Sequence, residues 1–206
     1  MSVEATGPLQ KSDLDPDPFE QFARWFQEAR QAGIPLPNAM TLATADGAGK
    51  PAARMVLLKE VDARGFVFYS NEESRKGQEL QDNPRAALVF YWPPLARQVR
   101  IEGRVERVAA DAADRYFASR PRGHQLGAHA SAQSRVIADR PFLEERLQEM
   151  TDKFAGQDVP RPPHWGGYRV VPEVLELWQE GENRLHDRLR YRRDEAGAWV
   201  IERLAP

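Results

Sequence analysis

The sequence predicts a mainly β protein with peripheral helices, an α+β fold whose strands form a closed or partly closed barrel. Short β-type runs follow one another from residue 39 to residue 108, with turn residues between them at Asp46-Gly47 and Asn83-Pro84. This is the spacing of a β-meander. Because mostly antiparallel strands leave exposed edges unless the sheet closes on itself, a barrel is the expected arrangement.

The first expected element is a helix. Asp15 or Asp17 can cap it, and Pro18 suits its first turn. Phe19, Phe22, Ala23 and Phe26 then fall on one helical face, and Gly33 ends the pattern. Residues 1–14 are polar and lack periodicity, which predicts a flexible N-terminal arm ahead of a single domain at residues 15–206.

The remaining elements follow from alternation, helical spacing and turn residues. Strands are predicted at residues 39–45, 51–60, 65–70, 85–92, 97–108, 168–178, 185–193 and 198–203. Helices are predicted at residues 73–82, 111–119 and 140–155, with Ser74 as the cap of the first. The proline-rich run at 159–163 predicts a stiff extended connector.

Composition excludes several classes of protein. The chain has 206 residues, 29 basic and 31 acidic, so its formal charge of −2 offers no global basic surface for nucleic acid. It has no cysteine, which excludes disulfides and thiolate metal ligands, and its four histidines form no metal-ligand motif. No apolar run is long enough to span a membrane, and the polar start is not a signal peptide, so a soluble cytoplasmic protein is expected.

Two cationic stretches carry the functional signal. In Arg184-Leu185-His186-Asp187-Arg188, a strand would place Arg184, His186 and Arg188 on one face, where they repel one another unless an anion lies among them. Residues 54–59, 65–70 and 74–76 form the second stretch, in which Arg75 and Lys76 begin a helix that could hold a phosphate. For both stretches the alternative is a charged surface exposed to solvent.

A family resemblance rests on these residues and on further motifs in the same order along nearly the whole chain. The motifs are RMVLLK at 54–59, FVFYSNEESRK at 66–76, ARQVRIEG at 96–103, YFASRPRGHQLGAHASAQS at 116–134, HWGGYRV at 164–170 and LWQEGENRLHDRLRYRR at 177–193. In these the sequence resembles the pyridoxine (pyridoxamine) 5′-phosphate oxidase family. The resemblance implies an FMN-binding split β-barrel and a homodimer that binds FMN in two clefts between its subunits.

The resemblance also implies the site residues. It assigns FMN binding to Arg54, Met55, Val56, Leu57, Leu58, Lys59, Tyr69, Ser70, Arg75, Lys76, Gln98, Gln133, Ser134, Trp178 and Arg188. It assigns the substrate to Lys59, Tyr116, Arg120, His124, Arg184, Leu185 and His186, with Arg184 and His186 as the catalytic pair. Arg54, Arg75 and Lys76 can neutralise the flavin phosphate, and Lys59, Tyr116 and Arg120 suit a substrate phosphate. Without the resemblance, Trp178 fits a buried core tryptophan as well as a flavin contact, and Gln98 and Gln133 fit structural amides better than ligand contacts.

The implied reaction is the oxidation of pyridoxine 5′-phosphate and pyridoxamine 5′-phosphate to pyridoxal 5′-phosphate, with molecular oxygen as acceptor and hydrogen peroxide as product. The sequence departs from the family at His124, where a serine is usual, and in its short N-terminal arm. Two other functions stay open. One is a related flavin oxidase that acts on a bulkier aromatic intermediate of phenazine biosynthesis, and the other is a flavin- or pyridoxal-phosphate-binding protein without turnover.

Overall fold

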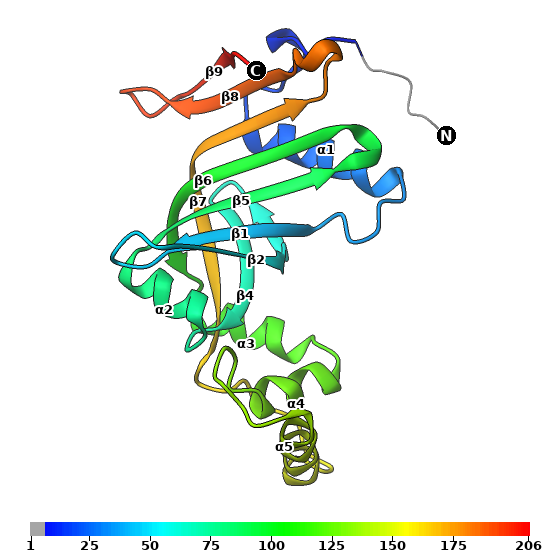
Figure 1. Cartoon of the computed structure of the whole chain (residues 1–206), viewed down its shortest axis with the longest axis vertical. Coiled ribbons are helices and arrows are strands. Elements are labelled where there is room, and N and C mark those ends of the chain that lie inside the picture. The colour runs from blue at the N-terminus through cyan, green and yellow to red at the C-terminus, as the bar shows by residue number, and fades with distance from the viewer. Residues whose placement is uncertain (1–6) are drawn as a thin grey trace.

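A computed structural model describes residues 7–206 and shows one long antiparallel sheet with helices at its side and at one end (Figure 1). The strands are β1 (Ala39–Ala45), β2 (Pro51–Leu57), β3 (Glu60–Asp62), β4 (Gly65–Asn71), β5 (Arg85–Trp92), β6 (Arg97–Arg107), β7 (Trp165–Gln179), β8 (Asp187–Arg193) and β9 (Trp199–Leu204). The helices are α1 (Pro18–Gln31), α2 (Arg75–Asp82), α3 (Ala110–Ala118), α4 (Arg122–Ala130) and α5 (Arg140–Lys153). Within residues 7–206, no helix is both long and apolar enough to cross a membrane.

The sheet has nine strands, and its main path runs β2-β1-β5-β6-β7-β4-β3. The β7 strand also pairs with β8, and β8 pairs with β9, so the long β7 strand belongs to both the main path and the C-terminal hairpin. Neither β2 nor β3 is hydrogen-bonded to the other within the described chain, so the path bends without closing. The expected split barrel with peripheral helices is confirmed.

The first helix forms as its sequence predicts. Asp17 caps α1 by accepting a hydrogen bond from the Phe19 backbone nitrogen at 2.8 Å. Phe22 is fully buried and meets Phe66 of β4 edge to face, with ring centroids 4.9 Å apart. The apolar face of α1 therefore closes one side of the main core.

Helix α2 is also confirmed, with Ser74 as its cap. Its first turn lies so close to the backbone of Glu72 that a Cβ atom at position 77 would stand 2.0 Å from the Glu72 carbonyl oxygen, and only glycine fits there. The glycine at this close approach fixes how the basic start of α2 sits on the end of β4.

Helix α4 was not predicted from the sequence. Its two glycines, Gly123 and Gly127, weaken the helical signal. The helix forms against a second apolar cluster, in which Leu126 packs with Phe117, Phe154, Val159 and Trp165. Figure 1 shows α3, α4 and α5 at one end of the long axis and the β8–β9 hairpin at the other.

The strand predicted at residues 185–193 begins two residues late, and this corrects the expected cationic face. Gln179 of β7 pairs with Asp187 of β8, so the residues between them form the connecting loop. Arg184 lies there at a φ of +63°, as the last residue of a short helical turn, Glu182–Arg184. Arg184 and His186 therefore do not share a strand face with Arg188, because a hairpin connection is needed where β7 turns back into β8.

The inner part of the predicted N-terminal arm makes specific contacts. The Leu9 backbone nitrogen donates to Asp187 Oδ2 at 2.9 Å, and Arg203 donates to the Leu9 carbonyl. Leu9 and Leu14 are buried. Residues 1–6 of the arm lie outside the described residues, and the flexibility of the arm stays a prediction.

Candidate active site

A cavity of about 770 Å³ opens beside α2, α3 and α4. Its lining contains three cationic side chains and, among the residues that the structure describes there, no aspartate or glutamate. The lining residues are Met55, Val56, Leu57, Lys59, Tyr69, Ser70, Asn71, Lys76, Tyr116, Ser119, Arg120, Pro121, Gly123, His124, Gly127, Ala128, Ser131, Gln133 and Trp165. Such a surface favours an anionic ligand of small-molecule size.

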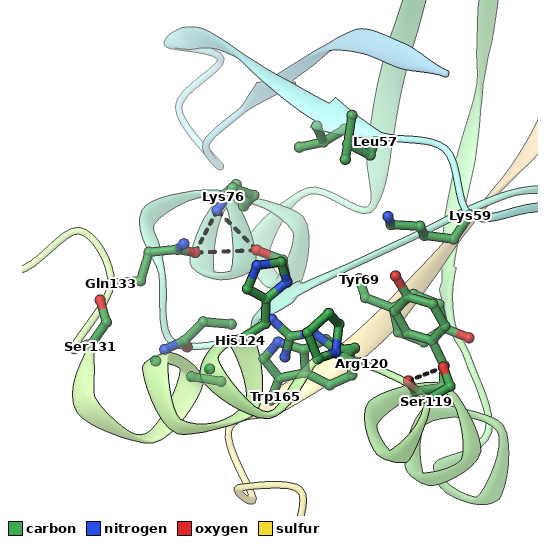
Figure 2. A pocket seen from close by; sticks show the side chains of 18 of the residues that line it. Leu57, Lys59, Tyr69, Lys76, Ser119, Arg120, His124, Ser131, Gln133 and Trp165 are labelled. Atoms are coloured by element: carbon green, nitrogen blue, oxygen red, sulfur yellow. Dashed lines mark hydrogen bonds between the residues drawn. The ribbon is translucent and has the colours of Figure 1, made fainter. Parts of the chain in front are cut away.

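Lys76 lies on one side of this cavity without a carboxylate partner among its hydrogen bonds (Figure 2). Its Nζ atom donates to Gln133 Oε1 at 2.8 Å, to Ser70 Oγ at 3.0 Å and to Ser74 Oγ at 3.2 Å. Burial lowers the pKa of Lys76 to about 8, nearby Arg54 lowers it too, and Glu79 acts in the opposite direction. An anion at this position would relieve the cost of the half-buried ammonium group.

Arg54 and Arg75 lie behind Lys76 and share one buried carboxylate, that of Glu79. Arg54 Nη2 donates to Glu79 Oε2 at 2.9 Å, and Arg75 Nε donates to Glu79 Oε1 at 2.7 Å. Burial raises the pKa of Glu79, but hydrogen bonds from Thr44, Arg75 and Arg54 outweigh it, so that the pKa lies below its usual value. These contacts tie the start of α2 to β1 and β2.

Arg120 forms a second cationic centre, two residues after the end of α3. Its guanidinium carbon lies 4.8 Å from the Trp165 ring centroid and 5.2 Å from that of Phe117. Burial lowers the pKa of Arg120, and Tyr116 opposes this effect. Arg120 Nη1 is buried and donates to no atom of the described chain. A buried charged donor without an acceptor is costly, so this atom fits an anion from outside the chain.

Aromatic rings form a wall next to Arg120. The Tyr69 and Tyr116 rings stack with centroids 4.2 Å apart, and the Tyr69 and Trp165 rings stack at 5.3 Å. Lys59 Nζ lies 5.8 Å from the Tyr116 centroid. In Figure 2, Lys59 and Tyr69 lie on the side of the cavity away from Lys76 and Gln133. The cavity therefore offers one cationic position at Lys76 and another at Lys59 and Arg120.

The cavity brings together most of the site residues that the sequence predicts from the two central motifs. The lining includes eight from the cofactor set, Met55, Val56, Leu57, Lys59, Tyr69, Ser70, Lys76 and Gln133, and four from the substrate set, Lys59, Tyr116, Arg120 and His124. Arg54 and Arg75 lie behind it in the Glu79 network, Leu58 is buried in the core, and Ser134 follows Gln133 outside the lining.

The remaining predicted residues do not line the cavity and lie around the end of β7, on the neighbouring strand β6 and at the start of β8. We call them the C-terminal group: Gln98, Trp178, Arg184, Leu185, His186 and Arg188. Gln98 and Trp178 are neighbours across β6 and β7, and the Trp178 and His186 ring centroids lie 4.7 Å apart. His186 Nδ1 accepts a hydrogen bond from the Gly181 nitrogen at 3.2 Å. Leu185 and His186 line a separate hollow of about 390 Å³ beside the C-terminus. Within one described chain, this C-terminal group and the cavity do not form a single site.

Arg188 of the C-terminal group is not the unpaired cation that the sequence suggests. Its Nε and Nη2 atoms donate to the two carboxylate oxygens of Glu176 at 2.8 and 3.1 Å. Glu176 is an earlier residue of the neighbouring strand β7, and its sequence position gives no sign of the pair. The bidentate contact neutralises Arg188 and fixes its direction.

The structure adds two residues that the sequence analysis missed. The first is Trp165, whose ring packs against the Arg120 guanidinium group. In the sequence it is only an aromatic residue after the proline-rich connector, and nothing there indicates its contact with Arg120. Glu79 joins Arg54 and Arg75, and the spacing of four residues between Arg75 and Glu79 in a helix could have indicated half of this network.

Comparisons with known proteins place the whole chain. A family model described as pyridoxamine 5′-phosphate oxidase matches residues 26–154, and one described as the pyridoxine 5′-phosphate oxidase C-terminal dimerisation region matches residues 165–206. The pyridoxine/pyridoxamine 5′-phosphate oxidase of Cupriavidus necator is 58% identical over 97% of this chain and 94% of its own length. That of Gloeothece citriformis is also 58% identical, over 96% of this chain and 92% of its own length.

Solved structures agree with the fold. PhzG from Burkholderia lata 383, in complex with tetrahydrophenazine-1-carboxylic acid, matches with a TM-score of 0.92 and 32% identity over the full length of both chains. An FMN-binding protein from Nostoc punctiforme matches with a TM-score of 0.75 and 15% identity, over 94% of this chain and all of its own, and supports the fold alone. From the matching models and relatives together, the chain belongs to the pyridoxamine 5′-phosphate oxidase family.

Proposed function

We propose that the chain is an FMN-dependent oxidase that converts pyridoxine 5′-phosphate and pyridoxamine 5′-phosphate to pyridoxal 5′-phosphate. Molecular oxygen is the electron acceptor and is reduced to hydrogen peroxide. With pyridoxamine 5′-phosphate the two-electron oxidation gives an imine, which takes up water to form the aldehyde and releases ammonia. The observation that carries this proposal is a cavity with two separate cationic positions, one at Lys76 and one at Lys59 and Arg120, and with no carboxylate among its lining residues in the described chain. Two phosphorylated ligands, a cofactor and a substrate, suit such a cavity.

The Lys76 side suits the phosphate of FMN. Lys76 is a half-buried ammonium whose hydrogen-bond partners in the described chain are neutral side chains, and it lies in the first turn of α2, where the helix dipole favours an anion. Ser70 and Gln133 can donate and accept hydrogen bonds next to it. When bound, FMN would supply the hydride acceptor and return its electrons to oxygen.

The Arg120 side suits the phosphate of the substrate. The buried Nη1 atom of Arg120 needs an acceptor, and a phosphate oxygen provides one. Tyr116 lies near both Arg120 and Lys59, and His124 lines the same cavity, so these residues can add a neutral hydroxyl donor, a charge and an imidazole. Anchoring the phosphate here would hold the pyridine ring in one orientation for oxidation.

A second copy of the chain completes the site in this proposal. The end of β7 and the loop before β8, which carry Trp178, Arg184 and His186, lie toward the opposite end of the molecule from α3 and α4 (Figure 1), in the part that matches the dimerisation region. In a homodimer with twofold symmetry, the C-terminal group of one chain can face the cavity of its partner. Arg184 and His186 would then act on the substrate as an electrostatic partner and an orienting ring.

The similarity to PhzG favours a second candidate, a flavin oxidase that acts on a larger aromatic acid. Such an enzyme would share the Lys76 side but would not need Lys59, Tyr116 and Arg120 for a phosphate. The higher identity to the pyridoxine/pyridoxamine 5′-phosphate oxidases and the gathering of these three residues support the first candidate.

The flavin that the protein carries tests the proposal directly. We expect the purified protein to be yellow and to release FMN, rather than riboflavin or FAD, on denaturation. The protein stripped of flavin should regain FMN in equal amount to its chains. Protein that lacks flavin and does not bind added FMN would contradict the proposal, and FMN binding without oxidation of any phosphorylated pyridine would indicate a binding protein.

The affinity for FMN is expected to fall as the pH rises through about 8. Because the pKa of Lys76 is lowered to about 8, the side chain is charged below that pH and loses its proton above it, so the charge-assisted contact with the phosphate is lost. A bound phosphate favours the charged form and moves the loss to somewhat higher pH. Flavin fluorescence titrations between about pH 7 and 9.5 measure this, since a phosphate monoester ionises near pH 6, below that range.

Lys76→Arg is the matched control, because arginine keeps its charge throughout this range. Its FMN affinity should change far less between pH 7 and 9.5 than that of the parent protein. Equal pH profiles for the parent and Lys76→Arg would show that Lys76 does not bind the phosphate through its charge.

A further inference from the structure

Glu79 is a buried acid in the middle of a basic cluster. Its side chain is 5% exposed, although an ionised carboxylate is costly to bury unless it is paired. It does not line the cavity, so a ligand there has no direct contact with it in this arrangement. The reason for a buried carboxylate at this position therefore lies in the side chains that it binds.

Each oxygen of Glu79 holds a different arginine. Oε1 accepts from Arg75 Nε at 2.7 Å, within α2. Oε2 accepts from Arg54 Nη2 at 2.9 Å and from Thr44 Oγ1 at 2.5 Å, which belong to β2 and β1. Arg54 also donates to Thr44 Oγ1 and to the Leu42 carbonyl at 3.4 Å. The carboxylate thus bridges the helix and the sheet and sets the positions of both guanidinium groups.

The charges of the cluster match a phosphate. Arg54, Arg75 and Lys76 are three cations, and Glu79 reduces their net charge to two. A phosphate monoester carries about −1.5 to −2 charges near pH 7, which this cluster can balance. Without Glu79, three neighbouring cations would repel one another and would move apart into solvent where they can, as Arg75 can from its exposed position.

We propose that Glu79 is a positioning residue for the phosphate of the cofactor, because its two oxygens fix Arg54 and Arg75 beside Lys76 without touching the ligand. The inference rests on the proposed function and adds to it a residue that acts through others. A purely structural Glu79 would stabilise the fold but would not affect phosphate binding separately from the rest of the flavin.

Glu79→Gln separates these roles because it keeps the shape of the side chain and removes its charge. Simple attraction predicts tighter FMN binding, since the cluster becomes more positive. Positioning predicts weaker binding, on the order of tenfold at pH 7, the size expected when charge-assisted contacts are lost. Riboflavin, which lacks the phosphate, should bind the variant and the parent equally. The pH at which FMN affinity falls should move lower, because Glu79 supports the charged form of Lys76.

Asp62→Asn is the matched control. Asp62 also holds two arginines, Arg64 at 2.7 Å and Arg169 at 2.5 Å, and it lies outside the cavity lining. The substitution removes the same charge from the protein as Glu79→Gln does, but away from the Lys76 cluster. The affinities for FMN and for riboflavin should therefore equal those of the parent. Glu79→Asp is the second variant, to be used if Glu79→Gln does not fold. It keeps the charge but is too short to hold both arginines, and it should also weaken FMN and not riboflavin.

Equal or tighter FMN binding by Glu79→Gln, or an equal loss of FMN and riboflavin, would overturn the inference. With only Glu79→Asp folded, unchanged FMN binding would do so. The proposed function fails differently: the parent would not bind FMN, or Lys76→Met would bind it as tightly as the parent. If the parent binds FMN, Lys76→Met weakens it and Glu79→Gln does not, only the role of Glu79 is wrong.

Discussion

Arg184→Ala is expected to lower the turnover of pyridoxine 5′-phosphate on the order of a hundredfold, the size seen when a group that stabilises developing charge is removed. Bound FMN should stay, because Arg184 is assigned to the substrate side of the site, whereas the phosphate of FMN is assigned to the cluster around Lys76. Steady-state kinetics and the flavin content of the purified variant measure the two effects. Loss of FMN with normal turnover after reconstitution would show that Arg184 serves the cofactor and not the substrate.

Mixing variants tests whether two chains build each site. Arg184→Ala and Lys76→Met should each be nearly inactive alone. If Lys76 of one chain works with Arg184 of its partner, random exchange of subunits gives mixed dimers with one intact site, and about a quarter of the parent activity returns. If both residues of a site came from one chain, every site would carry a defect and mixing would restore nothing.

Arg120→Met is expected to raise the Michaelis constant for pyridoxine 5′-phosphate by about ten- to a hundredfold, as the loss of a buried charge-assisted contact of about 1.5–3 kcal/mol implies. Methionine still packs on Trp165, so the aromatic wall should stay in place. FMN affinity should not change. The same loss for unphosphorylated pyridoxine would show that Arg120 does not recognise the phosphate.

The sequence predicts those parts of the fold whose signals are local. Asp17 and Pro18 mark the start of α1, and Ser74 marks the start of α2, because a cap is determined by a few neighbouring residues. Helix α4 depends on distant partners such as Trp165, which outweigh its glycines. The loop before β8 depends on where the pairing with β7 ends, and alternation of residue types does not show this.

The site shows the same division. Residue types alone indicate anion binding at Arg75-Lys76 and around Arg184, and the resemblance supplies the assignment to cofactor and substrate. The meeting of Lys76 and Gln133, 57 positions apart, and of Arg54 and Glu79, 25 positions apart, depends on the tertiary fold. No local pattern shows that Arg188 is neutralised by Glu176 or that Arg120 Nη1 is buried without an acceptor in the described chain.

Oxidation of pyridoxine 5′-phosphate by the FMN-loaded protein tests the central claim most directly. In the presence of oxygen, we expect pyridoxal 5′-phosphate and hydrogen peroxide to form in equal amounts, and unphosphorylated pyridoxine to react far more slowly at the same low concentration. Arg120→Met should reduce the difference between the two substrates. No aldehyde from pyridoxine 5′-phosphate with bound FMN, or equal rates for pyridoxine and its phosphate, would contradict the account.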